Sequence, residues 1–227
     1  MRSIKKEVLK ANRWIVEKDL VELTWGNVSY RQGDVIYIKP SGVDLDTATE
    51  EDISVLTIYG QKIDGKKPSV DTPTHLEIYK NFNNINCIVH THSKYSTTFA
   101  QANRQIPCLG TTHADYFYGD IPCVPHPNRR QIETNYELET GVEICKYFKS
   151  SGIDYKRMPC SLVSGHGAFI WGPSIEQTLE TAYVLELVAE MAYKSLTLIG
   201  ASSMRIPKYV IDKHFFRKNG KEKYYGQ

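Results

Sequence analysis

The sequence lacks the features that mark membrane-spanning and disulfide-rich secreted chains. None of its apolar runs reaches the roughly 20 residues that a transmembrane helix needs, and the first seven residues contain no apolar signal-peptide core. The five cysteines are scattered and form no CxxC pair, which argues against a disulfide framework and against a structural zinc site. We therefore expect a cytoplasmic protein whose cysteines act as small buried hydrophobic residues.

An excess of charge of either sign is also absent. Charged residues make up 24% of the 227 residues, and the net charge is +2 at pH 7. This balance is too weak to argue for nucleic acid or an anionic membrane surface as a partner. Hydrophobic residues make up 41% of the chain, which is enough for a sizeable core. No repeat, low-complexity tract or linker divides the chain, so we expect a single domain over residues 1–227.

Local patterns predict an α/β fold with a largely antiparallel sheet. Strands are expected at residues 25–30, 35–38, 56–59, 61–63, 87–92, 161–163 and 168–171, and helices at 4–18, 72–82, 93–103, 135–149 and 174–199. Residues 104–130 are irregular and predict either a long functional loop or several short elements. Because the strands come in hairpins with helices interspersed, the sheet is expected to be antiparallel and covered by helices.

Three details of the helices can be predicted from single residues. Thr72 and Ser93 are expected to cap the helices that begin beside them. In the longest helix, one broad apolar face is expected to carry Leu179, Tyr183, Leu187, Met191 and Leu198.

Two histidines, His90 and His92, end an apolar run that is typical of a buried strand. Strand side chains alternate between faces, so both imidazoles point the same way and could hold one divalent metal. An isolated pair of histidines of this kind more often has a structural role than a metal-binding one. However, His166 lies between two glycines and could supply a third ligand from a turn. Three protein ligands with an open position are typical of catalytic zinc, so the sequence predicts a Lewis-acid enzyme.

A series of short motifs resembles the class II aldolase/epimerase family, and in particular its sugar-phosphate epimerases. The motifs lie at residues 24–29, 39–43, 69–75, 90–93, 110–115, 165–167 and 224–227. Each motif alone is weakly specific, but their order over nearly the whole chain is highly specific. The resemblance implies a three-layer α/β/α fold around a central, largely antiparallel sheet. It also implies a homotetramer with active sites between neighbouring subunits.

The resemblance further implies a reaction that inverts C4 of a ketopentose 5-phosphate. C4 carries no acidic proton, so the C3–C4 bond must break in a retro-aldol step and re-form on the other face of the aldehyde. One Zn²⁺ per subunit, for which Mn²⁺ or Co²⁺ could substitute, stabilises the charge on the C2 oxygen. The implied ligands are His90, His92 and His166, with a carboxylate from Asp71.

The resemblance also implies roles for residues around this metal site. Asp115 and Tyr225 would transfer protons on opposite sides of the substrate. The phosphate and the rest of the substrate would be bound by Gly26, Asn27, Lys39, Ser41, Gly42, Ser69, the backbone of Val70, His214 and Arg217. The chain departs from the family at two places. The family usually has a serine in place of Val70, and it has Thr-Arg in place of Val124-Pro125, after which this segment continues as His126-Pro127-Asn128. For His113, a hydrogen-bonded loop histidine is favoured over a metal ligand.

Three other functions stay open. A class II sugar-phosphate aldolase would release the two fragments, but the family's aldolases carry a glutamate at the position of Asp71. A dehydratase of the same fold is a weaker alternative. A non-catalytic scaffold such as the adducin head shares the fold without the metal histidines, and a scaffold has no physical need for Asp115 and Tyr225 beside them.

The pathway is also left open by the sequence, because arabinose catabolism and an ascorbate/gulonate route both use such an epimerase.

Overall fold

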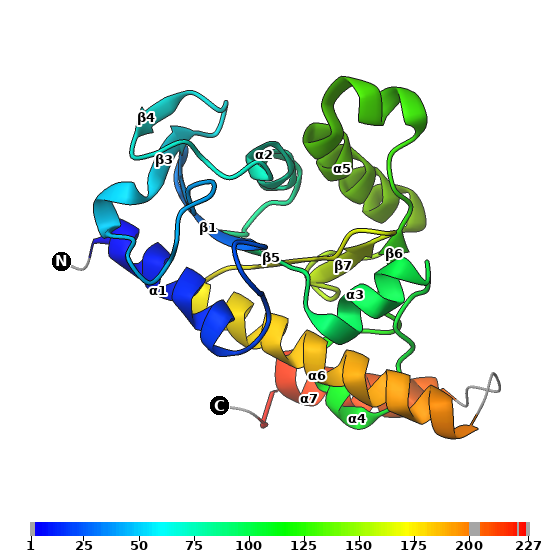
Figure 1. Cartoon of the computed structure of the whole chain (residues 1–227). Coiled ribbons are helices and arrows are strands. Elements are labelled where there is room, and N and C mark those ends of the chain that lie inside the picture. The colour runs from blue at the N-terminus through cyan, green and yellow to red at the C-terminus, as the bar shows by residue number, and fades with distance from the viewer. Residues whose placement is uncertain (1–2, 200–204, 222, 226–227) are drawn as a thin grey trace.

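A central eight-stranded sheet with helices on both faces organises the chain (Figure 1). This computed structural model describes residues 3–199, 205–221 and 223–225. The strand order is β4-β3-β2-β1-β5-β8-β7-β6, and β6–β7 is the one parallel pair among the described strands. The prediction of a three-layer α/β/α fold with a largely antiparallel sheet is therefore confirmed.

The predicted strands and helices occur in the predicted order along the chain, and η1, α4, β6 and α7 are added to them. The strands are β1 (Asn27–Gln32), β2 (Val35–Ile38), β3 (Ser54–Thr57), β4 (Lys62–Asp64), β5 (Cys87–Thr91), β6 (Cys123–Val124), β7 (Cys160–Val163) and β8 (Ala168–Gly172). The helices are α1 (Ile4–Glu17), the 3-10 helix η1 (Glu50–Asp52), α2 (Thr72–Asn81), α3 (Lys94–Gln101), α4 (Thr111–Tyr116), α5 (Arg129–Ser151), α6 (Ile175–Ile199) and α7 (Lys208–Asn219). Residues 104–130 thus contain short elements rather than one long loop.

Strand β5 is the rigid centre of the sheet. It pairs with β1 on one side and with β8 on the other, and all five of its residues are buried. Helices α2 and α5 cover one face of the sheet, and α6 lies on the opposite face with α1, α3, α4 and α7 (Figure 1). Because both faces of β5 are covered, its apolar residues pack on both sides, and the histidines at its end start from a fixed backbone.

The structure corrects the predicted apolar face of α6. Leu179 is buried, but Tyr183, Met191 and Leu198 are 38%, 51% and 86% exposed. The side that packs against the sheet and α3 instead carries Ala182, Val184, Leu185, Val188, Ala189 and Ala192. The helix is apolar on more than one side, so spacing alone could not identify the buried side.

The predicted helix caps are also corrected. Asp71 occupies the cap position of α2, and the hydroxyl of Thr72 donates to the carbonyl of Ser69 at 2.6 Å. Ser93 occupies the cap position of α3, but its side chain makes no capping hydrogen bond with a backbone N–H of that helix; its hydroxyl pairs with that of Ser96 at 2.8 Å. The acceptor is Glu186 of α6, reached by the backbone N–H of Tyr95 at 2.6 Å and of Ser96 at 3.0 Å.

The cysteines and the absence of long apolar helices were the two expectations from composition. All five cysteines are free, and four of them are buried, whereas Cys123 is only half-buried. In the described part of the chain, no helix has the length and apolar character needed to cross a membrane.

Candidate metal centre

Three histidines converge at the end of β5. His90 belongs to the strand and His92 follows it, and their Nε2 atoms lie 3.0 Å apart. His166 lies in the turn between β7 and β8. One ligand atom from each of the three imidazoles lies within 4.8 Å of the others. The structure therefore brings together three of the four predicted metal ligands.

The surroundings orient the ring of His90 for metal binding. Its Nδ1 lies 2.9 Å from the carbonyl of Ala168, which accepts a hydrogen bond, so Nδ1 carries the proton and Nε2 keeps its lone pair. The ring also stacks on Phe169, with centroids 4.2 Å apart. Gly167 lets the turn approach β5, because a Cβ there would lie 2.5 Å from the carbonyl oxygen of Thr91.

The protonation states of these histidines suit a cation. Burial, followed by the charge of His90, lowers the pKa of His92 to about 4 and that of His166 to about 3. Burial also lowers the pKa of His90, although Asp71 partly opposes that effect. All three imidazoles are therefore neutral at pH 7, the state that binds a metal. Three neutral imidazoles directed at one point fit a divalent transition metal.

Asp71 lies beside the histidines but outside the group of three. Its Oδ2 accepts hydrogen bonds from Asn27 Nδ2 at 2.7 Å and from Ser69 Oγ at 3.4 Å. Burial raises the pKa of Asp71, but the nearby histidines, His90 foremost, lower it by more, so the net shift is downward. Asp71 is therefore an anchored carboxylate that adds negative charge next to the neutral imidazoles.

The predicted phosphate residues Gly26, Asn27, Lys39 and Ser69 gather on the same side. Asn27 pairs with His90 across β1 and β5. Gly26 has φ +75°, and a Cβ there would lie 2.6 Å from the carbonyl oxygen of His90. Lys39 is buried, with Nζ donating to the carbonyl of Thr24 at 2.9 Å. Burial lowers its pKa, and Asp71 partly opposes this.

The remaining predicted phosphate residues lie on the two loops beside this group. The backbone N–H of Ser41 donates to the carbonyl of Lys67 at 2.9 Å, so the loop after β2 is held against the loop before α2. Gly42 follows with φ +64° and has open space where a Cβ would stand. The side chain of Val70 is 59% exposed.

A second cluster gathers the other four predicted residues. On α4, Asp115 accepts hydrogen bonds from His214 Nδ1 at 3.1 Å and from Arg217 Nη2 at 3.1 Å, both on α7. The guanidinium of Arg217 lies 4.2 Å from the ring centroid of Tyr225. In the described part of the chain, no hydrogen bond or ion pair joins this cluster to the metal histidines. The last two residues of the predicted tail motif, 226–227, lie outside the described residues.

His113 and the segment that departs from the family, residues 124–128, make contacts within the fold that stabilise α4, β6 and the start of α5. His113 lies on α4, where its Nε2 hydrogen bonds to the carbonyl of Gly119 at 2.8 Å. Val124 belongs to β6, beside β7. Asn128 caps α5, because its Oδ1 accepts from the backbone N–H of Gln131 at 3.1 Å. The departing segment therefore leads from the sheet edge into the helix that covers the histidines.

Sequence reasoning missed Tyr136, whose hydroxyl lies 3.2 Å from Nδ1 of His166. It follows Asn135, whose φ of −159° and ψ of 78° interrupt α5. An asparagine before a tyrosine is a weak signal for a helix restart, and no local pattern could place that tyrosine beside a histidine 30 residues further along.

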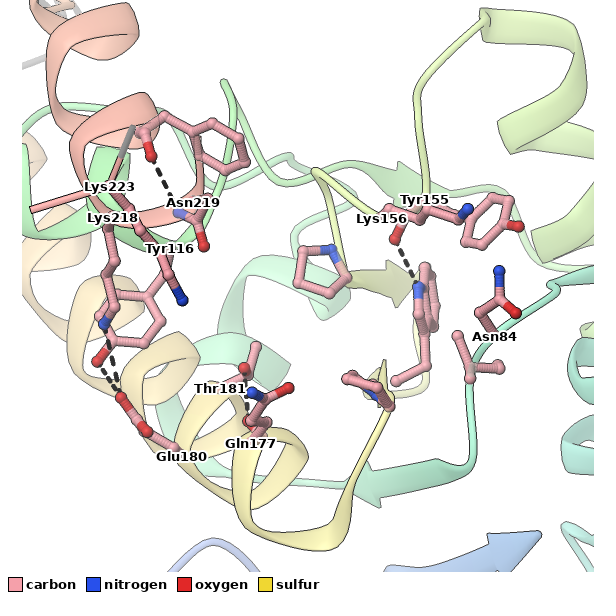
Figure 2. A pocket seen from close by; sticks show the side chains of 16 residues that line it. Asn84, Tyr116, Tyr155, Lys156, Gln177, Glu180, Thr181, Lys218, Asn219 and Lys223 are labelled. Atoms are coloured by element: carbon pink, nitrogen blue, oxygen red, sulfur yellow. Dashed lines mark hydrogen bonds and ion pairs between the residues drawn. The ribbon is translucent and has the colours of Figure 1, made fainter. Parts of the chain in front are cut away.

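Figure 2 shows the side chains that line a cavity of about 550 Å³. Its lining comes from α4, α6, α7, the end of β8 and the segments before β5 and β7, and includes Tyr116, Glu180 and Lys218. None of the three metal histidines lines it. Asn219, which lines it, donates to the backbone carbonyl of Asp115 at 2.8 Å. The cavity therefore borders the Asp115 cluster and is separate from the metal centre.

Comparisons with known proteins agree with this architecture. Residues 6–193 match the family described as Class II Aldolase and Adducin N-terminal domain. An L-fuculose 1-phosphate aldolase superposes with a TM-score of 0.80 at 24% identity, over 94% of this chain and 96% of that one. YgbL from Klebsiella pneumoniae, a putative aldolase/epimerase/decarboxylase, gives 0.73 at 21% identity, over 92% and 96%. An L-fuculose-1-phosphate aldolase from Thermus thermophilus gives 0.68 at 21% identity, over 88% and 97%.

Proposed function

Since the chain belongs to the class II aldolase and adducin N-terminal domain family, we propose that it is a zinc-dependent L-ribulose-5-phosphate 4-epimerase. It would interconvert L-ribulose 5-phosphate and D-xylulose 5-phosphate by breaking and re-forming the C3–C4 bond. The three converging histidines support a metal-dependent enzyme of this family over a scaffold. We also propose that residues 1–227 form one domain.

The tethered carboxylate of Asp71 carries the preference for an epimerase over an aldolase. The family's aldolases have the longer glutamate at this position, which reaches the cleaved carbon as an acid or base. Asp71 is shorter, and its Oδ2 is held by Asn27 at 2.7 Å and by Ser69 at 3.4 Å. A carboxylate anchored in this way would not reach the carbon of the cleaved bond. It would therefore not protonate the enediolate, which would stay available to re-form the C3–C4 bond.

The residues of the metal centre would bind and orient the substrate. His90, His92 and His166 would hold the metal, with Asp71 beside them. When bound, the metal supplies a Lewis acid that stabilises negative charge on the ketose oxygens. Asn27 Oδ1 is buried and has no hydrogen-bond partner among the described residues, so it offers an acceptor to a substrate hydroxyl.

Asp115 and Tyr225 would move the protons at the C4 oxygen. That oxygen loses its proton when the C3–C4 bond breaks, and it regains one after the aldehyde has rotated. Two groups on opposite sides are therefore needed. Asp115 is held by His214 and Arg217, so its carboxylate has a defined orientation. The ring of Tyr225 lies against the same arginine.

We propose that the site is completed by a neighbouring subunit of a homotetramer. Within one chain, the Asp115 cluster lies on α4 and α7, on the opposite side of the sheet from α2 and α5 (Figure 1). The histidines are approached from α2 and α5, through Asp71 and Tyr136. In a closed ring of four subunits, the proton-transfer pair of one subunit would serve the metal centre of the next.

The product of the reaction tests this proposal against the aldolase. Zinc-loaded protein is incubated with L-ribulose 5-phosphate, and both D-xylulose 5-phosphate and free glycolaldehyde phosphate are measured over time. We expect the epimer to form faster than the free aldehyde is released. Faster release of the aldehyde would favour the aldolase. Absence of turnover together with absence of bound zinc would favour a scaffold.

A further inference from the structure

The helix that covers the histidines is divided into two parts beside them. Asn135 leaves the helical conformation inside α5, and its Oδ1 accepts from the backbone N–H of Leu138 at 3.4 Å. Asn135 therefore acts as a cap for the second part of the helix. Tyr136 is the first residue of that part, and Thr140 Oγ1 donates to its carbonyl at 2.8 Å. This local structure defines the position from which the Tyr136 side chain extends.

Close packing between α2 and α5 fixes that position relative to the metal centre. A Cβ on Gly141 would lie 2.8 Å from Glu77 Cβ and 3.0 Å from the carbonyl oxygen of Thr74, so only glycine lets the two helices approach this closely. The hydroxyl of Thr74 also donates to the carbonyl of Glu137, the residue after Tyr136. Because Asp71 is the cap residue of α2, Tyr136 and the carboxylate of the metal centre are held on one packed unit.

The hydrogen bond between Tyr136 and His166 determines which ring nitrogen is available to a metal. The tyrosine hydroxyl lies 3.2 Å from Nδ1. A neutral imidazole has one protonated nitrogen and one lone pair. If Nδ1 donates its proton to the tyrosine oxygen, the lone pair is on Nε2, the nitrogen that His90 also offers. A histidine that binds a metal generally has such a partner on its other nitrogen, and loss of the partner weakens binding.

We propose that Tyr136 is a positioning residue that holds His166 in the tautomer and orientation needed for the third metal ligand. This inference rests on the proposed metal centre. It adds a residue that acts through His166, in the same way that the carbonyl of Ala168 orients His90. His166 lies in a turn, whereas His90 lies in a buried strand, so His166 depends more on a side-chain partner for its orientation.

A double-mutant cycle on zinc affinity tests this role. Dissociation constants are measured by competition with a chromophoric chelator for the wild type, Tyr136→Phe, His166→Asn and the double variant. We expect Tyr136→Phe to weaken zinc binding about tenfold or more, the effect of losing a hydrogen-bonded partner of a ligand. In the His166→Asn background, where the partner has nothing to orient, the same change is expected to have no effect.

Tyr147→Phe is the matched control, because Tyr147 lies on the same helix and packs against the core. Its zinc affinity should equal that of the wild type. Equal affinity of Tyr136→Phe and wild type would overturn the inference, and so would an equal loss in both backgrounds, which would mean that Tyr136 acts independently of His166. Absence of zinc binding by the wild type would instead contradict the proposed function itself.

Discussion

Removal of the Glu186 carboxylate should destabilise the helix that follows the metal histidines. Glu186 extends from α6 to the start of α3. There it accepts hydrogen bonds from the backbone N–H of Tyr95 at 2.6 Å and of Ser96 at 3.0 Å, and from the hydroxyl of Ser93 at 2.7 Å. Ser93 directly follows His92. A single carboxylate therefore caps α3, neutralises the positive end of its dipole and joins it to α6.

The size of the effect follows from these three contacts. Loss of a helix cap costs about 1 kcal/mol, and a donor that loses a charged acceptor costs about 1–3 kcal/mol, depending on burial. The site is part-buried, so water can replace some of the contacts. We therefore expect Glu186→Ala to lower the free energy of unfolding by about 3 kcal/mol. Glu186→Gln keeps one acceptor oxygen and loses the charge, so we expect a loss of about 1 kcal/mol.

Urea unfolding of metal-free protein at one protomer concentration measures this difference. With an m-value of about 3 kcal/mol/M, Glu186→Ala should lower the urea midpoint by about 1 M. The control is Glu190→Gln, one turn later on α6, which removes the charge that pairs with Lys194 on the surface and keeps an acceptor oxygen for the nearby Tyr95 hydroxyl, so it should leave the midpoint nearly unchanged. A midpoint of Glu186→Ala equal to that of the control would refute the assignment of Glu186 as the cap of α3.

Three further predictions concern the metal, the proton-transfer pair and a buried histidine. Chelation should abolish activity, and His92→Asn should lower the zinc content of purified protein; full activity of a metal-free preparation would contradict the metal centre. Tyr225→Phe should reduce turnover about a hundredfold with zinc content unchanged. Mixing this variant with Asp115→Asn should restore part of the activity, because hybrid tetramers would contain sites with both residues intact. Near-normal turnover after truncation before Tyr224 would contradict the role of Tyr225. Burial lowers the pKa of His113 to about 4, whereas an unfolded histidine titrates near 6.5. The unfolded chain therefore binds the proton first as pH falls. The free energy of unfolding should decrease by about 1.4 kcal/mol between pH 7.5 and 5.5 for this reason. His113→Gln keeps a donor for the carbonyl of Gly119, and its free energy of unfolding, measured with urea, should decrease by about 1.4 kcal/mol less than that of the wild type over the same pH range. Equal decreases in the two proteins would refute the buried neutral state of His113.

The pair of metal histidines on β5 could be predicted from the sequence because the relevant rule is local. Side chains on a strand alternate with a period of two residues, so His90 and His92 had to share a face once the strand was recognised. Their Nε2 atoms lie 3.0 Å apart, although the strand itself ends one residue before His92. The hairpin of β1 and β2 was predictable for the same reason, since Gly33 allows the left-handed turn between them.

Contacts between distant segments could not be predicted in this way. Ser93 has the sequence signature of a helix cap, but the acceptor is Glu186, 91 residues from Tyr95. The apolar residues of α6 were identified from their spacing, but the buried side was decided by packing against the sheet and α3. Local patterns specify which side chains share a face, whereas the partner of that face depends on the arrangement of the whole chain.

The sequence by itself determined the order of the main strands and helices, the largely antiparallel character of the sheet and the identity of the three histidines that converge. These follow from periodicity, from turn residues and from the order of motifs that resemble one family. Only the tertiary structure brought Tyr136 to His166, tethered Asp71 to Asn27, and separated the Asp115 cluster from the metal centre. These arrangements depend on how elements pack across the sheet, because the free energy of a long-range contact depends on the whole fold and on no single segment.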